Sequence, residues 1–311
     1  MSTDIGFSTE LKSIVGSHKK IKQSVGGRVF NACNYTLFIL LSILMLYPFW
    51  NQIMMSLSSA NMAAAGGTFL WPKQFTVYTY QNVLKSKNII SGFRVSAIVT
   101  IAGTILGTSF TAMMAYPLSK LKLRGNAVLM FLIVFTMLFN GGMIPGYMLI
   151  KSLNMLDSLP ALILPSLVGA YNVIIMRTFY ASIPPSLEES AKIDGANDLM
   201  IFFRLIVPLS MATIATIALF TAVMYWNDYF STILYITSKN KWSMQAELRN
   251  ILLNTAQALR DSGVEVTNSV VINENTVKAV SVVITTLPIL ILYPFLQKYF
   301  VKGVMIGSIK G

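Results

Sequence analysis

Residues 33–57 read CNYTLFILLSILMLYPFWNQIMMSL, an apolar run that contains no charged side chain. A bilayer core about 30 Å thick is crossed by a helix of about 20 residues, so this run is long enough. Lipid offers no partner for backbone N–H and C=O groups, and a helix satisfies all of them internally. The run therefore predicts a spanning helix. Because a long polar stretch precedes it, it does not resemble a cleaved signal peptide.

Five further runs are long enough to cross a bilayer, and the third and fourth spans contain internal Gly and Pro that predict kinks or breaks. These five runs lie near 92–118, 127–150, 159–180, 208–237 and 277–298. The breaking residues are Gly141, Gly142 and Pro145 in the third span, and Pro165 and Gly169 in the fourth. Only 12% of the 311 residues are charged, about half the share in soluble domains. The sequence predicts an all-α, polytopic membrane protein with about six spans.

The distribution of Lys and Arg predicts the orientation in the membrane. The short loop 119–126 contains Lys120, Lys122 and Arg124, whereas the loop 151–158 contains only Lys151. Because short cytoplasmic loops are rich in Lys and Arg, both termini are expected in the cytoplasm. The expected segments are a cytoplasmic tail 1–32, a first span with external loop 33–91, a core 92–303 with the cytoplasmic loop 181–207, and a cytoplasmic tail 304–311.

Several function classes find no support in the sequence. The net charge of +12 is spread over loops, without the basic stripe interleaved with aromatic residues that nucleic-acid binding requires. The single cysteine, Cys33, and single histidine, His18, predict neither an intrachain disulfide nor a metal site. A phosphate-binding loop is absent, so the chain is not expected to hydrolyse ATP or to bind a cofactor.

The loop 181–207 has the strongest local signals. Ser186 and Glu189 have the spacing of a capping box that starts a helix. Gly195 suits the left-handed conformation that ends helices, and Asn197 is a good cap for a second helix. The loop is therefore expected to form two short helices joined by a glycine turn. Such short helices are marginal in water and need a surface to pack against.

This loop resembles the EAA motif of bacterial ABC importer permeases. The matching residues are Glu189-Ser190-Ala191, then after three residues Gly195, and after nine more Leu205-Ile206-Val207-Pro208. Ser190 stands where that motif has Ala. Other stretches are similar to the carbohydrate-uptake branch, especially the second permease of maltose-type systems and the complex-oligosaccharide subgroup. They are Glu188–Ala196, Met176–Tyr180, Tyr225–Phe230 and Gln297–Gly303.

The resemblance implies a type I ABC importer permease in the bacterial plasma (inner) membrane. It implies a heterodimer with a homologous permease, two ATP-binding subunits that hold ATP and Mg²⁺, an external solute-binding protein and a carbohydrate substrate. It also implies that the loop 181–207 couples to the ATPase; local cap and turn chemistry is the alternative interpretation. The residues expected to couple are Glu188, Glu189, Ala191, Asp194, Gly195, Ala196, Arg204 and Pro208.

Polar residues within the apolar runs are candidates for the substrate path. Asp228 is an acid inside the fifth run, where a carboxylate usually faces a cavity or a partner. With Trp226, Asn227 and Tyr229 it could line a sugar path, since aromatic rings stack on sugars and carboxylates and amides bind hydroxyls. The alternative is an interfacial aromatic belt with a structural salt bridge. Further candidates are Asn140 and Asn172.

The competing function is an autonomous secondary transporter. That class predicts an inverted repeat, membrane-buried charge pairs and usually more spans. The sequence shows no such repeat, and Asp228 alone is thin support for such a mechanism. The sugar itself is not identified by the sequence.

Overall fold

The computed structural model describes residues 24–120, 123–253 and 274–308, with side chains up to residue 291 in the last range. Lys122, most of the N-terminal tail and the side chains of Gln297–Gly303 lie outside this description. So does most of the segment 238–276. The chain divides into two compact units, Met1–Trp50 and Asn51–Gly311.

The first unit contains most of helix α2 (Val25–Ser56), whose bounds start earlier than the predicted Cys33. The Ser24 hydroxyl accepts a hydrogen bond from the N–H of Gly27, and this cap explains the earlier start. Phe38, Leu44 and the other apolar side chains of this part of the helix are exposed, as expected for a helix surrounded by lipid.

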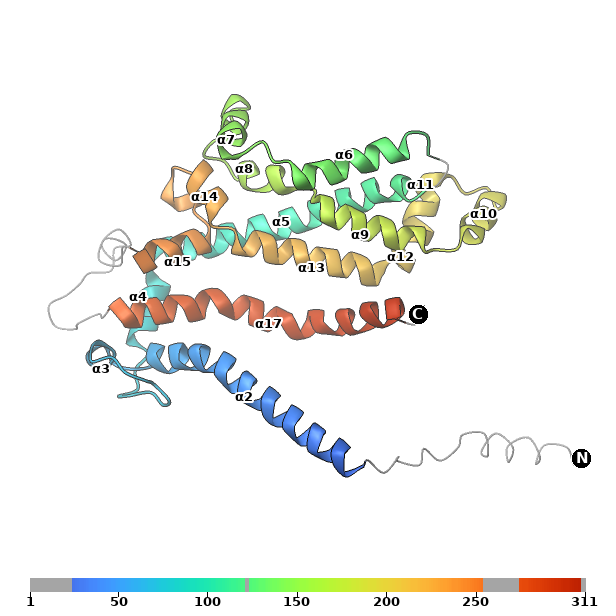
Figure 1. Cartoon of the computed structure of the whole chain (residues 1–311). Coiled ribbons are helices and arrows are strands. Elements are labelled where there is room, and N and C mark those ends of the chain that lie inside the picture. Colours follow the sequence, from blue (N-terminus) through green and yellow to red (C-terminus); the bar gives the residue numbers. More distant parts are fainter. Residues whose placement is uncertain (1–23, 121–122, 254–273, 309–311) are drawn as a thin grey trace, which may run out of the picture. The chain divides into compact units, whose positions relative to one another are not determined.

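The second unit is built around α5 (Lys87–Leu118), which packs on α9 (Ala170–Ala181) and α13 (Met211–Asn227) (Figure 1). Two glycines permit this close packing. A Cβ on Gly103 would lie 2.5 Å from the ring of Tyr225, and one on Gly107 would lie 2.7 Å from the carbonyl oxygen of Leu167. Both positions must be Gly because neither the ring nor the backbone can move aside cheaply.

The remaining described elements of the second unit are also helical. In chain order they are α3 (Ala60–Ala64), α4 (Tyr78–Lys85), α6 (Asn126–Leu138), α7 (Met143–Ser152), α8 (Pro160–Ile163), η1 (Leu164–Ser166), α10 (Pro185–Ile193), α11 (Asp198–Ile201), η2 (Phe202–Ile206), α12 (Val207–Leu209), α14 (Phe230–Tyr235), η3 (Lys239–Lys241), α15 (Met244–Leu253) and α17 (Glu274–Ser308).

The predicted breaks in the third and fourth spans are confirmed. α6 and α7 meet at an angle of 112°, and the α8–η1 segment meets α9 at 52°. A third bend, of 81°, separates the segment Asp198–Leu209 from α13. Among the described residues, three helices are long and apolar enough to cross a membrane alone, and up to six crossings result if each bent pair is one span. This agrees with the prediction of about six.

The fifth span differs from its predicted bounds of 208–237. α13 ends at Asn227, and Asp228 has an extended backbone before α14 begins. The Asp228 carboxylate accepts the N–H of Ser231, and its carbonyl accepts the hydroxyl of Ser243. Asp side chains that bind nearby backbone groups compete with helix continuation. The predicted fifth run, 208–237, is therefore not one helix, and Asp228 lies at the break between α13 and α14.

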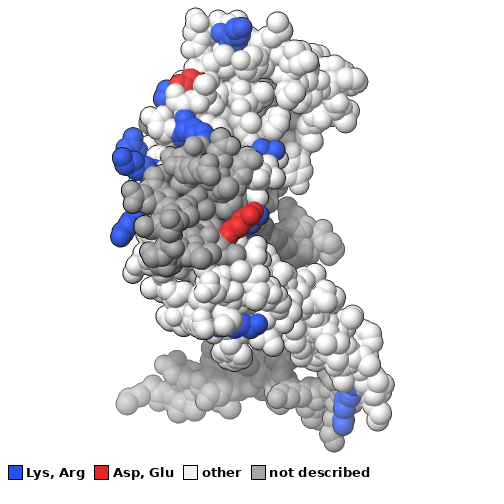
Figure 2. All heavy atoms as spheres, turned by 90° about the vertical axis from the view of Figure 1, so that its left-hand side faces the viewer, with Lys and Arg blue, Asp and Glu red and all other residues white. Residues whose placement is uncertain are grey.

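The two ends of the second unit differ in structure. The segment 181–207, which contains α10 and α11 and is called the α10–α11 loop, lies at one end together with the C-terminal end of α17. α14 and α15 lie toward the other end (Figure 1). Figure 2 shows the molecule from that side, where uncharged surface separates the described Lys and Arg side chains and part of the face is formed by residues that are not described.

Candidate functional site

The α10–α11 loop has a well-formed glycine turn. Gly195 has a φ of 85°, as predicted, and nothing lies within 4 Å of the position a Cβ would take. The N–H of Ala196 bonds to the carbonyl of Ala191 at 2.9 Å, and the N–H of Gly195 to that of Lys192 at 3.0 Å. These two bonds are those of a Schellman motif, which satisfies the last carbonyls of a helix. These backbone bonds therefore close the turn.

The second helix of the loop starts at the predicted cap. The Asn197 side chain accepts the N–H of Met200 at 2.8 Å. α11 then continues through the π-type segment η2, in which Phe202 and Ile206 are buried. Arg204 and Pro208, both expected to couple, are exposed on this continuation.

The predicted capping box of Ser186 and Glu189 is wrong. α10 begins at Pro185, and the residue before it makes no side-chain cap. Proline at the first helical position has its φ already set for a helix and lacks the N–H that would need a partner. Ser186 therefore lies inside the first turn and does not precede it.

The other predicted coupling residues fall on two faces of the loop. Ala191 and Ala196 are partly buried and pack against the hydrophobic core of their own chain. Glu189, Asp194 and Gly195 are exposed. The loop thus has an inner face of small residues and an outer polar face.

Two residues that sequence reasoning missed complete the outer face. The side chains of Ile193 and Leu199 are 86% and 70% exposed. Apolar side chains gathered on an exposed face mark contact surfaces, whereas single exposed ones are common. Their place on either side of the predicted Gly195 turn was the signal that could have identified them.

Glu188 is held differently from the other acids of the loop. Its side chain is 15% exposed and forms an ion pair with Lys120, which follows α5. The nearby pair of Lys192 and Asp198, 3.0 Å apart, is 56% and 74% exposed. The hydrogen bond to the Asp198 carboxylate raises the pKa of Lys192. Pairs as exposed as this one contribute little to stability.

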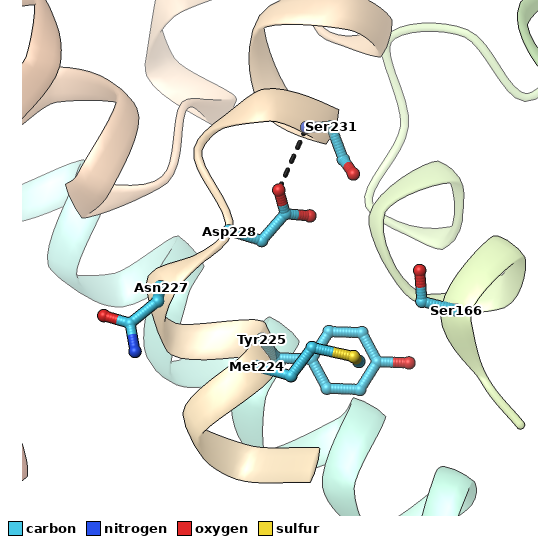
Figure 3. A pocket seen from close by; sticks show the side chains of 6 residues that line it. All are labelled: Ser166, Met224, Tyr225, Asn227, Asp228 and Ser231. Carbon is cyan, nitrogen blue, oxygen red and sulfur yellow. Dashed lines mark hydrogen bonds between the residues drawn. The ribbon is translucent and has the colours of Figure 1, made fainter. Parts of the chain in front are cut away.

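A cavity of about 320 Å³ lies beside the break after α13 (Figure 3). The residues that line it are Ser166, Met224, Tyr225, Asn227, Asp228 and Ser231. Asp228 and Ser166 point into it from opposite sides, whereas the amide of Asn227 turns away and donates to the carbonyl of Val223. The Tyr225 hydroxyl donates to the carbonyl of Ile163 at 2.8 Å, which ties α13 to α8.

The remaining predicted substrate-path residues do not line this cavity. Trp226 is buried, packs edge-on against Phe93, and donates from its indole nitrogen to the carbonyl of Thr285. Tyr229 is exposed, with the guanidinium carbon of Arg249 5.4 Å from its ring centroid.

The two asparagines also lie outside the cavity. Asn140 accepts the N–H of Gly142 at the break between α6 and α7. Asn172 lies within 3.5 Å of the hydroxyl of Thr221, which places it between α9 and α13. Of the predicted path residues, the structure brings only Asn227 and Asp228 together at the cavity.

Asp157 forms a bonded centre that sequence reasoning missed. Its carboxylate accepts bonds from the N–H groups of Thr237 and Ser238, from the Ser238 hydroxyl, and from the Lys241 ammonium at 3.1 Å. The bond from the Ser238 N–H is the main cause that lowers the pKa of Asp157. We call this set of contacts the Asp157 staple. Because the partners of Asp157 lie about 80 residues further along the chain, no local sequence pattern could predict these bonds.

Within the part of the chain that the structure describes, no cluster of three or more His, Cys, Asp or Glu side chains could hold a metal ion.

The chain is similar to known transport proteins over most of its length. The family model for the binding-protein-dependent transport system inner membrane component matches residues 13–306. A polygalacturonan/rhamnogalacturonan transport system permease protein of Bacillus subtilis, YtcP, is 42% identical, covering 91% of this chain and 99% of that protein. Protein LplC of the same organism is 41% identical, covering 92% and 96%. A solved bacterial ABC transporter involved in import of the acidic polysaccharide alginate matches with a TM-score of 0.81 and 32% identity, covering 89% and 99%.

Proposed function

The chain belongs to the family of binding-protein-dependent transport system inner membrane components, and from this premise we propose that it forms half of the translocation path for an oligosaccharide. It is a multi-pass permease subunit of an ABC importer, neither an enzyme nor an autonomous transporter. Energy for transport must therefore come from ATP hydrolysis on another polypeptide.

The loop 181–207 is the coupling element in this proposal. The observation that carries it is the double helix around Gly195, which is held by its own backbone bonds and exposes Ile193 and Leu199 on its outer face. A preformed element with exposed apolar side chains loses little conformational entropy when it docks on a partner. The outer acids Glu189 and Asp194 would set the orientation of docking.

The proposed complex contains a second, homologous permease, two ATPase subunits that hold ATP and Mg²⁺, and an external solute-binding protein. The coupling loop and both termini face the cytoplasm. The orientation is supported by the excess of Lys and Arg in the short loop 119–126 over that in 151–158.

The substrate class is inferred from the relatives and from the cavity. One similar protein is described as a polygalacturonan/rhamnogalacturonan transport system permease, and a similar solved structure as a transporter involved in the import of the acidic polysaccharide alginate. In this chain, the carboxylate of Asp228 and the hydroxyl of Ser166 face each other across the cavity. Carboxylates and hydroxyls bind sugar hydroxyl groups, which fits an oligosaccharide passing this point.

Purification of the tagged chain from its own membranes tests the assembly. We expect a second permease and ATPase subunits to co-purify, and ATP hydrolysis to disappear when the chain is purified alone. Uptake of labelled oligogalacturonides and alginate oligosaccharides, with labelled maltotriose as a neutral comparison, tests the substrate class. ATP hydrolysis by the isolated chain would contradict the proposal.

Cysteine labelling tests the orientation after Cys33→Ser removes the single native cysteine. A membrane-impermeant thiol reagent added to intact cells should label Lys73→Cys and Lys241→Cys but not Gly195→Cys. Labelling of Gly195→Cys from outside would place the loop on the wrong side for an ATPase.

A further inference from the structure

The end of α5 holds the α10–α11 loop at three points. The ring of Tyr116, in the last turn of α5, contacts Tyr180 at the end of α9, with centroids 6.3 Å apart. It also contacts Phe202, just after α11, at 5.2 Å. Between these two points along the chain, Glu188 of α10 pairs with Lys120. The loop is thus attached at both of its bases and in the middle.

The ammonium group of Lys120 takes part in both the aromatic and the ionic contacts. Its ammonium lies 4.2 Å from the ring centroid of Tyr116 while it pairs with Glu188. A cation over an aromatic face is attracted by the ring, so the two contacts hold the same ammonium in one place. Glu188, with its side chain 15% exposed, would be left with a largely buried charge if Lys120 were removed.

The backbone around Lys120 is fixed by two other spans. The Arg177 guanidinium of α9 donates to the carbonyl of Leu118 at 3.0 Å. The amide of Asn126, at the start of α6, donates to the carbonyls of Leu118 and Lys120, each at 3.1 Å. These bonds satisfy carbonyls that the end of α5 leaves unpaired. Lys120 therefore presents its charge from a rigid junction of three spans.

We propose that the ion pair of Lys120 and Glu188 positions the coupling loop and carries its displacement into α5. The inference rests on the function proposed above. Chain continuity links the loop only to α9 and, through η2 and α12, to α13. The contacts of Tyr116 link both bases of the loop to α5, and the ion pair adds a link from its middle; the 32 residues of α5 extend over about 48 Å toward the opposite end. There the hydroxyl of Ser96 accepts the N–H of Met244, which begins α15.

Charge reversal tests the pair. In the importer purified with its partner subunits, Lys120→Glu and Glu188→Lys should each retain about fivefold less ATPase subunit, a loss of about 1 kcal/mol of binding free energy. The double variant restores an opposite-charge pair, so retention should return to within about twofold of the unaltered importer.

The partly exposed pair of Glu274 and Lys278, at the start of α17, provides a control that lies outside the loop. Exchanging these two charges, singly or together, should change retention by less than about twofold, because exposed pairs contribute little. Lys120→Arg keeps the charge and should behave like the unaltered chain. Lys120→Gln avoids charge repulsion and should reproduce the loss if the charge reversals fail to insert.

The outcomes separate the two proposals. Normal retention by Lys120→Glu and Lys120→Gln overturns this inference alone. The inference is also overturned if the double variant inserts normally but does not regain ATPase retention. A pair that positions the loop by its opposite charges must work again when the two charges are exchanged. Failure of the unaltered chain to retain any ATPase subunit would remove the proposed function and this inference together.

Discussion

The α10–α11 loop and the Asp157 staple are two bonded regions of one unit that achieve order in opposite ways. The loop's turn is made by backbone groups within about six residues of one another, and it exposes Ile193 and Leu199. The staple joins two segments about 80 residues apart around one carboxylate. The glycine turn of the loop therefore forms from local backbone bonds and leaves an exposed face, whereas the staple locks two distant segments together.

The largest loss of transport is expected when a substitution disrupts the glycine turn of the loop. Gly195→Val places a β-branched residue at a φ of 85° and costs roughly 1–2 kcal/mol of strain. Because the spans are untouched, the variant should insert normally, lose most transport and retain little ATPase subunit. The measurement is uptake alongside co-purification.

Gly66 is a matched control for that substitution, because it also has a positive φ, of 71°, and open space around its Cβ position. Gly66→Val introduces the same type of strain away from the loop. Uptake equally reduced in both variants would show that backbone strain in general, and not the loop, limits transport.

A second large effect, on association with the ATPase subunit, is expected from substituting Ile193 on the outer face of the loop. Burying an Ile side chain in an interface contributes about 1.5–3 kcal/mol, and Ile193 is 86% exposed in the free chain. Ile193→Asp should therefore weaken ATPase association about tenfold or more, while Ile193→Leu should remain close to normal. An affinity titration of the purified ATPase subunit on the permease complex would reveal this. Equal affinities for both variants would exclude Ile193 from the docking face.

A moderate effect is expected from Asp228. Asp228→Asn keeps an acceptor for the Ser231 N–H but removes the charge that faces the cavity. Uptake should fall several-fold while insertion and assembly remain normal. Asp228→Ala also removes the bond that the Asp228 carboxylate accepts from the Ser231 N–H, at a cost of about 0.5–2 kcal/mol, and should lower the melting temperature as well. Failure of Asp228→Asn to assemble would favour a purely structural role.

The smallest effect on transport is expected at the Asp157 staple. Asp157→Asn should lower the melting temperature by a few degrees and change uptake less than twofold. The pKa of Asp157 is lowered in the folded chain, so its contribution is present above the ordinary Asp pKa of 3.8 and is lost as the pH falls further.

The pH dependence gives the staple a specific signature. The difference in stability between the unaltered chain and Asp157→Asn should be constant from about pH 8 to 5 and shrink below about pH 4. Thermal unfolding in detergent across this range provides the measurement. A difference that grows on acidification would contradict the assigned bonds.

Features that depend on neighbouring residues were predicted from the sequence. The apolar runs, the breaks at Gly142 and Gly169, the positive φ of Gly195 and the cap of Asn197 all follow from interactions within a few residues. The capping box of Ser186 failed although it too is local, because Pro185 offered an equally local and stronger start for α10.

Features that join distant segments were decided by the tertiary structure. The pairing of Lys120 with Glu188 links residues 68 positions apart, and neither side chain has a local pattern that names its partner. Likewise, only packing against Phe93 and Thr285 turns Trp226 away from the cavity that Asp228 faces. Hydrophobic periodicity and turn chemistry specify which helices form and where they end. Which side chains meet is specified by how those helices pack, and that depends on the whole chain at once.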